Sequence, residues 1–219
     1  MMRSVCLAAM TGLYVLTGTA GQPGSPSWVD RSNENAGILL EVMARFNPET
    51  AGQLGVDGYD DQTIDLRPDL DQRSRAATGE ALTVLRERLE AESDPAVLQD
   101  LAILIEAAED DIRGTDLYAA YQLPYYNVAR IAFSGIRSLL DDQIPPERRT
   151  AALVRLQRYA GTTPGTMPIA TLARQRISEK IENKDLKGPV RAEVEKDLSD
   201  AGFFVSGIES LFTKYGITG

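Results

Sequence analysis

The sequence predicts an all-α fold, with roughly seven or eight helices in an irregular array and a long last helix. Three observations predict this class. Apolar residues recur at the helical spacing through most of the chain, and no segment alternates apolar with polar residues as a half-buried strand does. Proline, glycine or aspartate stands at most segment boundaries, and the connections are as short as helix-to-helix loops usually are.

The first residues predict export. Within residues 1–20, Arg3 precedes an apolar stretch over residues 5–16, and the small residues 18–20 suit a cleavage site before Gly21. A membrane-spanning anchor is the competing interpretation, but polar residues interrupt a stretch that is already short of the ~20 apolar residues a spanning helix needs. We therefore expect a signal peptide, a periplasmic or secreted protein, and no membrane contact after cleavage.

Composition argues against several classes of site and partner. The one cysteine, Cys6, lies in the expected signal peptide, and the chain has no histidine. The exported part therefore lacks thiolates, the commonest general base near neutral pH and the commonest zinc ligand. A net charge of −9 argues against nucleic acid and anionic lipid as partners. The sequence predicts no catalytic residues, no metal ligands and no cofactor in this chain.

The exported part is expected to be a flexible lead, residues 21–27, followed by one helical domain over residues 28–219. Ser27 is placed to cap the first helix. This helix should stop at Asn47, because the following proline can open a helix but cannot continue one. A short helix is then expected over residues 48–54. The apolar face of the first helix comprises Leu39, Leu40, Val42, Met43 and Phe46.

Residues 56–66 have neither a helical period nor a clean alternation, which predicts an ordered surface loop. Its four aspartates suggest a calcium site, so we compared their spacing with the twelve-residue helix-loop-helix site. Counting from the first aspartate, Tyr59, Gln62 and Pro68 stand at the third, sixth and twelfth positions, where that site needs an acid or amide, a glycine and a glutamate. Solvated loop acids are the expected alternative. The aspartates are Asp57, Asp60, Asp61 and Asp65.

Two long helices are expected next. The first covers residues 68–92, and Asp94 and Pro95 then supply the cap and the first turn of the second. Gly114 and residues 122–124 are expected to break this second helix. Its apolar stripe, the clearest in the chain, comprises Val97, Leu101, Leu104, Ala108 and Ile112.

Four further segments complete the prediction. A helix carries Val128 to Leu139 and ends at residues 141–145, a compact helix covers 146–160, and glycine, threonine and proline make a turn at 161–165. The next helix holds Ala170, Ala173, Ile177 and Ile181. The last helix follows Gly188 and Pro189. Its expected apolar side comprises Val190, Val194, Leu198, Ala201, Val205, Ile208, Phe212 and Tyr215.

Residues Tyr125, Tyr126 and Asn127 are the densest aromatic and amide group in the chain and the candidate substrate-facing residues. The competing interpretation is a packed helix start, in which Asn127 caps the helix and one tyrosine packs against its next turn.

Three weaker groups were weighed as well. Glu106, Asp110 and Asp111 lie within about a helical turn of one another and are either a cation site or an ordinary acidic face. Ser210 and Lys214 have the minimum spacing for a serine with a lysine base, yet a polar helix edge explains them equally. Acids at 141–142 stand at a helix end that disfavours negative charge, which points to Arg148 or Arg149 as their partner.

Several ordered segments together resemble a bacterial family known as domain of unknown function 885. The carrying stretches are residues 44–51 (ARFNPETA), 54–55 (LG), 124–128 (PYYNV), 139–145 (LLDDQIP), 147–149 (ERR), 152–156 (ALVRL), 158–161 (RYAG), 172–176 (LARQR), 207–208 (GI) and 211–216 (LFTKYG). The resemblance spans nearly the whole expected mature chain.

The resemblance implies a particular place for this chain. Members of the family are typically longer, mostly helical and often exported, and they look like zinc-dependent peptidases because their C-terminal half carries a His-Glu-x-x-His helix. This chain would correspond to the N-terminal helical portion, which forms one wall of the substrate cleft in a full-length relative. Zinc and a peptide substrate are implied only for such relatives. No metal ligand carries over to a chain without histidine.

Two functions are therefore expected in competition. The first is a non-catalytic portion of a metallopeptidase-like protein, arising from a truncated gene or a split product. The second is a free-standing exported helical binding module. If the last helix normally packs on a C-terminal half, its apolar side would be partly uncovered here, and the chain would pair with that half or with itself.

Overall fold

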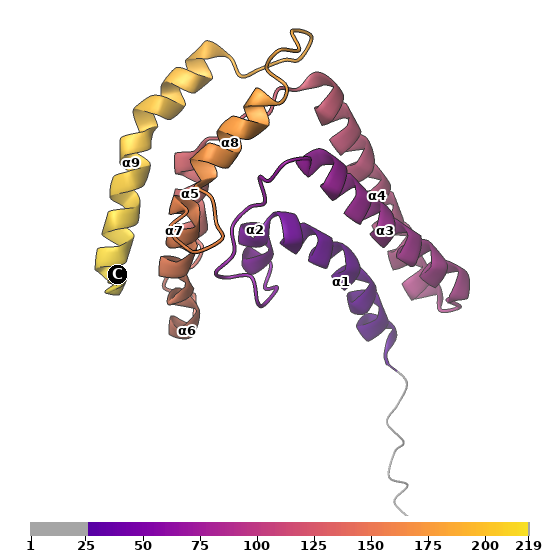
Figure 1. The fold of residues 1–219 in the computed structure, drawn as a ribbon. Helices are drawn as coiled ribbons and strands as arrows, with labels where there is room; N and C mark the ends of the chain where they lie inside the picture. The colour runs from indigo at the N-terminus through magenta and orange to yellow at the C-terminus, as the bar shows by residue number, and fades with distance from the viewer. Residues whose placement is uncertain (1–25, 219) are drawn as a thin grey trace, which may run out of the picture.

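The computed structural model describes residues 26–218, and within this range the chain is helical without any strand (Figure 1). The predicted all-α class and the long last helix are confirmed. The expected signal peptide, and residues 21–25 of the expected lead, lie outside the described residues. The helices are α1 Trp28–Phe46, α2 Pro48–Gln53, α3 Leu70–Ala91, α4 Pro95–Tyr121, α5 Val128–Arg137, α6 Pro146–Arg149, α7 Ala151–Ala160, α8 Ile169–Ser178 and α9 Arg191–Tyr215.

Helix starts follow local capping chemistry, as the sequence predicts. The side chain of Ser27 accepts a hydrogen bond from the backbone of Asp30, and Asp30 bonds back to the backbone of Ser27, which completes a capping box. Asp94 accepts from the backbone N–H of Ala96 at the start of α4, where proline occupies the first turn. These caps satisfy backbone donors that the helices themselves leave unpaired.

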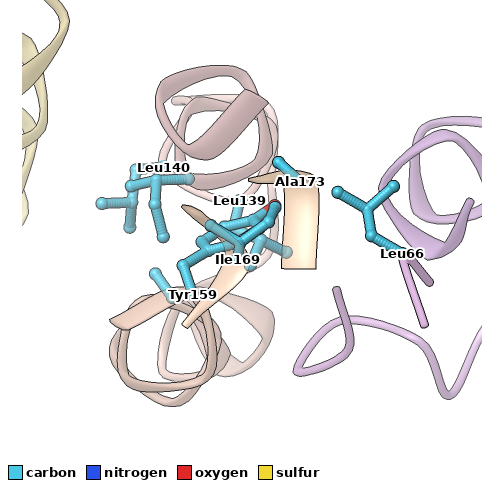
Figure 2. Packing of buried hydrophobic residues seen from close by; sticks show 8 residues of the cluster. Leu66, Leu139, Leu140, Tyr159, Ile169 and Ala173 are labelled. Atoms are coloured by element: carbon cyan, nitrogen blue, oxygen red, sulfur yellow. The ribbon is translucent and has the colours of Figure 1, made fainter. Parts of the chain in front are cut away.

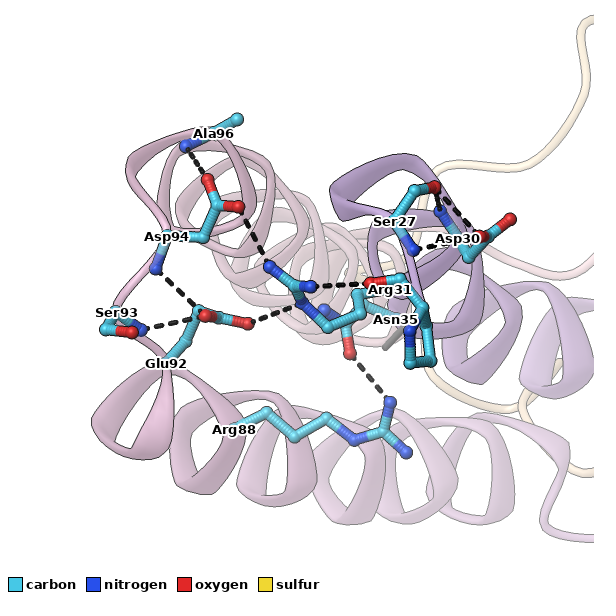
Figure 3. A network of polar contacts seen from close by, with 10 residues as sticks. Ser27, Asp30, Arg31, Asn35, Arg88, Glu92, Ser93, Asp94 and Ala96 are labelled. Carbon is cyan, nitrogen blue, oxygen red and sulfur yellow. Dashed lines mark hydrogen bonds and ion pairs between the residues drawn. The ribbon is translucent and has the colours of Figure 1, made fainter. Parts of the chain in front are cut away.

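Helices α1, α3 and α4 form the first group. Leu85, Val97 and Leu101 are buried at its centre, and half-buried apolar residues of α1 and α4 pack around them. Arg31 ties α1 to the turn between α3 and α4, because its guanidinium donates to Glu92 Oε2 at 3.2 Å and to Asp94 Oδ2 at 2.9 Å (Figure 3).

Helices α5, α7, α8 and α9 form the second group. Its buried core lies among α5, α7 and α8 and consists of Leu66, Ile136, Leu139, Leu140, Ala152, Tyr159, Ile169 and Ala173. Figure 2 shows Leu66 reaching this core from the loop that precedes α3. This leucine therefore connects the two groups of helices. Among the described residues, no helix is long and apolar enough to cross a membrane.

Three predicted boundaries are wrong. α4 is 27 residues long and is not broken at Gly114; it ends at Tyr121. A single glycine costs a helix only about 1 kcal/mol, which is too little to end it. Ile181 lies beyond the end of α8 at Ser178. Residues 146–160 form two helices that meet at Thr150, whose backbone is itself helical, so the compact helix is only briefly interrupted.

The predicted apolar side of α9 is also partly wrong. Leu198 and Val205 are 72% and 55% exposed, and Val190 precedes the helix and is 68% exposed. Ile208 and Phe212, which also belong to the predicted apolar side, do pack against the buried core of the second group of helices. The reason is geometric, since α9 lies along α5 (Figure 1) and one neighbouring helix covers only a narrow strip of the helix surface. The flanks of the apolar side stay uncovered.

Candidate functional site

Two adjoining cavities lie beside α1, α3 and α4, and the second also borders the loop before α3 and the segment before α5. The first has a volume of about 390 Å³ and the second about 380 Å³. Their walls share Phe46, Asn47, Ser74 and Asp111, so the two cavities lie next to each other, and the pair is called the α1–α4 groove from here on. A groove of this size accommodates a few side chains of a bound polypeptide.

The first cavity is mainly apolar. Every residue of the apolar face predicted for the first helix lines it, and Leu104, Ala107 and Ala108 supply the opposite wall from α4. Phe46 is buried, whereas the other residues of this α1 face are only half-buried. The face therefore carries more apolar surface than the three-helix group covers. Met43 adds a flexible side chain that can adapt to different apolar ligands.

Asp111 lies where the two cavities meet. Its Oδ2 accepts a hydrogen bond of 2.9 Å from Thr78 Oγ1, and Thr78 is 3% exposed on α3. The hydroxyl therefore comes from a side chain that packing holds in place, which orients the carboxylate. Asp111 itself is exposed to the groove and forms no ion pair with any of the described residues.

The other two carboxylates of the second cavity have cationic partners. Asp65 is buried and accepts hydrogen bonds from the guanidinium groups of Arg67 and Arg73. Burial raises the pKa of Asp65, but the bonds from both arginines outweigh it and hold that pKa well below its ordinary value. Asp71 pairs with Lys180 Nζ at 2.7 Å. These two acids therefore stabilise the fold through internal ion pairs.

Two tyrosines form the far wall of the second cavity. Burial raises the pKa of Tyr126 to about 12, and burial also raises the pKa of Tyr118. Both phenols are therefore neutral near pH 7 and add aromatic surface to the lining of the second cavity. Tyr118 is 40% exposed and so remains accessible to a ligand.

The structure separates the three candidate substrate-facing residues. Tyr126 lines the second cavity. Tyr125 points to α9, where its hydroxyl donates to Asp197 Oδ2 at 2.9 Å. Asn127 is buried and its Oδ1 accepts from the backbone N–H of Arg130, which is the capping role of the competing interpretation. A substrate-facing role thus stays a prediction that the geometry favours for Tyr126 alone.

The loop over residues 56–66 is not a solvated acidic segment, and the prediction is wrong for three of its four aspartates. Arg148 donates to both carboxylate oxygens of Asp60, at 2.7 and 2.8 Å, and Arg158 donates to Asp61 at 2.7 Å. Asp65 is buried between its two arginines, and Asp57 alone is exposed. The arginines that pair with Asp60 and Asp61 are 88 and 97 residues away in the sequence, whereas Arg67 and Arg73 are only 2 and 8 residues from Asp65.

A buried arginine holds the backbone of the same loop. Arg155 is 1% exposed and donates to the carbonyl oxygen of Tyr59 at 2.9 Å and to that of Gly135 at 2.8 Å. Burial lowers the pKa of Arg155. Next to it, the hydroxyl of Tyr159 donates to Glu49 Oε1 at 2.5 Å. These contacts connect α2, the loop, α5 and α7.

No protein-family model matches the chain, and neither a curated protein nor a solved structure matches it. The resemblance to domain of unknown function 885 stays a prediction.

The remaining candidate groups do not assemble into sites. Ser210 Oγ donates to the backbone oxygen of Ser206, while Lys214 pairs with Asp142, so the serine and lysine do not act together. The side chain of Asp142 thus pairs with Lys214, while Arg149, one of the two expected partners, donates to the backbone oxygen of Asp142 at 3.2 Å.

The three α4 acids likewise have separate environments. Glu106 is exposed, Asp110 pairs with Arg113, and Asp111 lies in the groove. Among residues 26–218, no group of three acids, histidines or cysteines is placed to hold a metal ion.

Proposed function

We propose that this chain is a non-catalytic, exported helical portion of a protein resembling the domain of unknown function 885 family, and that its α1–α4 groove binds an apolar segment of a polypeptide. The observation that carries the proposal is the groove itself. It combines a mostly apolar first cavity with a polar second cavity, which is the usual composition of a binding site.

The shape of the groove supports a polypeptide ligand. Two adjoining cavities of similar volume, about 390 and 380 Å³, suit alternate side chains of an extended segment, which project to the same side. Burying one leucine or phenylalanine side chain contributes about 1.5–3 kcal/mol, so one or two such contacts give weak but measurable binding. In a full-length relative, this groove would be the part of the substrate cleft that holds the polypeptide away from the catalytic half.

Filling the first cavity should abolish this binding. Ala107→Trp places an indole in the cavity from an exposed position on α4. We expect affinity for a fluorescein-labelled peptide with leucines spaced by serine and glycine to fall at least about tenfold, because the leucine pocket is occupied. Fluorescence anisotropy measures the affinity, and thermal unfolding checks that the variant folds.

The matched control is Ala102→Trp, at an exposed position of the same helix that does not line either cavity. It should bind the peptide as the unchanged protein does. Equal affinity of both variants and the unchanged protein would show that the groove is not the binding site.

A second proposal concerns the partner, and the uncovered flank of α9 favours it. Leu198 and Val205, seven residues apart on one side of this helix, are 72% and 55% exposed. We propose that this flank pairs with a C-terminal half like that of the resembled family, or with a second copy when such a half is absent. The other function from the sequence, a free-standing binding module, needs no such partner.

Sedimentation velocity separates these alternatives. The purified protein alone should self-associate at micromolar concentration, and the double substitution Leu198→Lys with Val205→Lys should make it monomeric, because two charges would have to be buried in the contact. Ser199→Lys, at an exposed polar position of α9, serves as the control. A soluble monomer at all concentrations would favour the free-standing module instead.

A further inference from the structure

We infer that the α1–α4 groove selects a ligand in which an apolar side chain is followed by a cationic one, with the cation bound by Asp111. This inference rests on the proposed function, since it names the class of polypeptide that the groove would take. A lysine or arginine two residues after a leucine, valine or phenylalanine has this chemistry.

The position of Asp111 is the first step. It is the one charged residue that lines both cavities. A ligand whose apolar side chain occupies the first cavity must therefore place its next polar group beside this carboxylate or continue past it into the second cavity. In an extended segment the side chains two residues apart lie on the same side, about 6.6 Å from each other, so the apolar and the cationic side chain would be separated by one residue.

The lack of a cationic partner is the second step. Asp65 and Asp71, the other acids of the groove, are paired with Arg73 and Lys180. Asp111 accepts only the Thr78 hydroxyl at Oδ2, and among the described residues nothing donates to its Oδ1. A ligand cation can therefore bind without displacing an internal partner. A ligand carboxylate would instead be repelled, which gives the groove a charge preference.

The walls beside Asp111 are the third step. Tyr118 and Tyr126 line the second cavity as neutral phenols, so they add aromatic surface and no further negative charge beside Asp111. A net charge of −9 on the whole chain adds a long-range attraction for basic segments. The local and overall charges thus favour the same class of ligand.

Three labelled peptides that differ at one residue test the inference. Each carries leucine within a glycine–serine background, with lysine, acetyl-lysine or glutamate two residues after it. The purified protein should bind the lysine peptide about fivefold more tightly than the acetyl-lysine peptide, and the glutamate peptide most weakly. This preference should shrink as salt rises from about 0.05 to 0.5 M, because exposed ion pairs are screened.

Two variants locate the preference. Asp111→Asn keeps the shape of the side chain and the bond from Thr78 but removes the charge, so it should bind the lysine and acetyl-lysine peptides equally. Glu106→Gln makes the same change of charge at an exposed position of α4 outside the groove and should keep the fivefold preference.

The failures are distinguishable. If the unchanged protein binds the lysine and acetyl-lysine peptides equally and Ala107→Trp abolishes both, the groove binds apolar segments and the inference about charge is wrong. A preference that survives Asp111→Asn likewise overturns the role of this residue. If the unchanged protein binds none of the three peptides, the proposed function itself fails.

Discussion

Gly135→Ala is expected to destabilise the protein by about 3 kcal/mol, the upper range for inserting a methyl group into a filled site. A Cβ at this position would lie 2.1 Å from Tyr159 Oη and 3.1 Å from Glu49 Cγ. Tyr159 is 3% exposed and cannot move away without breaking its bond to Glu49. Chemical denaturation followed by circular dichroism measures the change in unfolding free energy.

Because the closest contact of the new Cβ is with the Tyr159 hydroxyl, removing that hydroxyl should relieve part of the destabilisation. Tyr159→Phe removes the hydroxyl and leaves the ring carbon at 3.1 Å from the new Cβ, so the double variant should be more stable than the sum of the two single changes predicts, by about 1–2 kcal/mol. Gly114→Ala is the matched control, because a Cβ there meets nothing within 4 Å and should stabilise α4 by about 1 kcal/mol. Additive effects at positions 135 and 159 would contradict the packing described.

Arg155→Met is expected to cost about 3 kcal/mol as well. The substitution preserves most of the buried volume but removes one hydrogen bond from each of the carbonyl oxygens of Tyr59 and Gly135, and a bond from a charged donor contributes about 1.5–3 kcal/mol. Each carbonyl keeps a second donor, the N–H of Gln62 for Tyr59 and the hydroxyl of Ser138 for Gly135. Removing a buried charge recovers part of this loss, since burial disfavours the charged guanidinium. Thermal and chemical unfolding give the magnitude, and hydrogen exchange shows whether the loop over residues 56–66 is released.

Arg137→Met provides the comparison on α5, at an exposed arginine. Its effect should stay within about 0.5 kcal/mol, as for most surface substitutions. If both substitutions had the same small effect, the arginine would not be holding the loop. Arg155→Lys should fall between the two, because one ammonium group cannot span both carbonyls as the guanidinium does.

Elements governed by neighbouring residues could be predicted from the sequence. The capped start at Ser27, the proline-opened starts at Pro48 and Pro95, and the left-handed Gly161 after α7 follow from local backbone chemistry. The apolar face of the first helix was also identified residue by residue. That this face lines a cavity could not be predicted, because the arrangement of α3 and α4 decides whether such a face is covered or lines a groove.

The parts that could not be predicted depend on residues far apart in the chain. Asp60 and Arg148 form a bidentate pair across 88 positions, and the loop acids look solvated until α6 and α7 are in place. Asp111 belonged to an acidic group on α4, but its place in the groove depends on Thr78 of another helix. The spacing of apolar residues cannot predict either contact, because it indicates which side of a single helix is buried and not which other segment packs there.

The loop over residues 56–66 has a mechanical consequence. Leu66 is anchored in the second core, the backbone N–H of Asp65 bonds to the carbonyl of Phe46 at 3.0 Å, and three arginines hold the segment between them. This irregular loop thus holds the two groups of helices in a fixed arrangement, whereas irregular segments between helices often act as hinges. Thermal unfolding of the two groups of helices should therefore occur in a single transition. Shortening or cleaving the loop should let the two groups separate and should change the shape of the α1–α4 groove at Phe46.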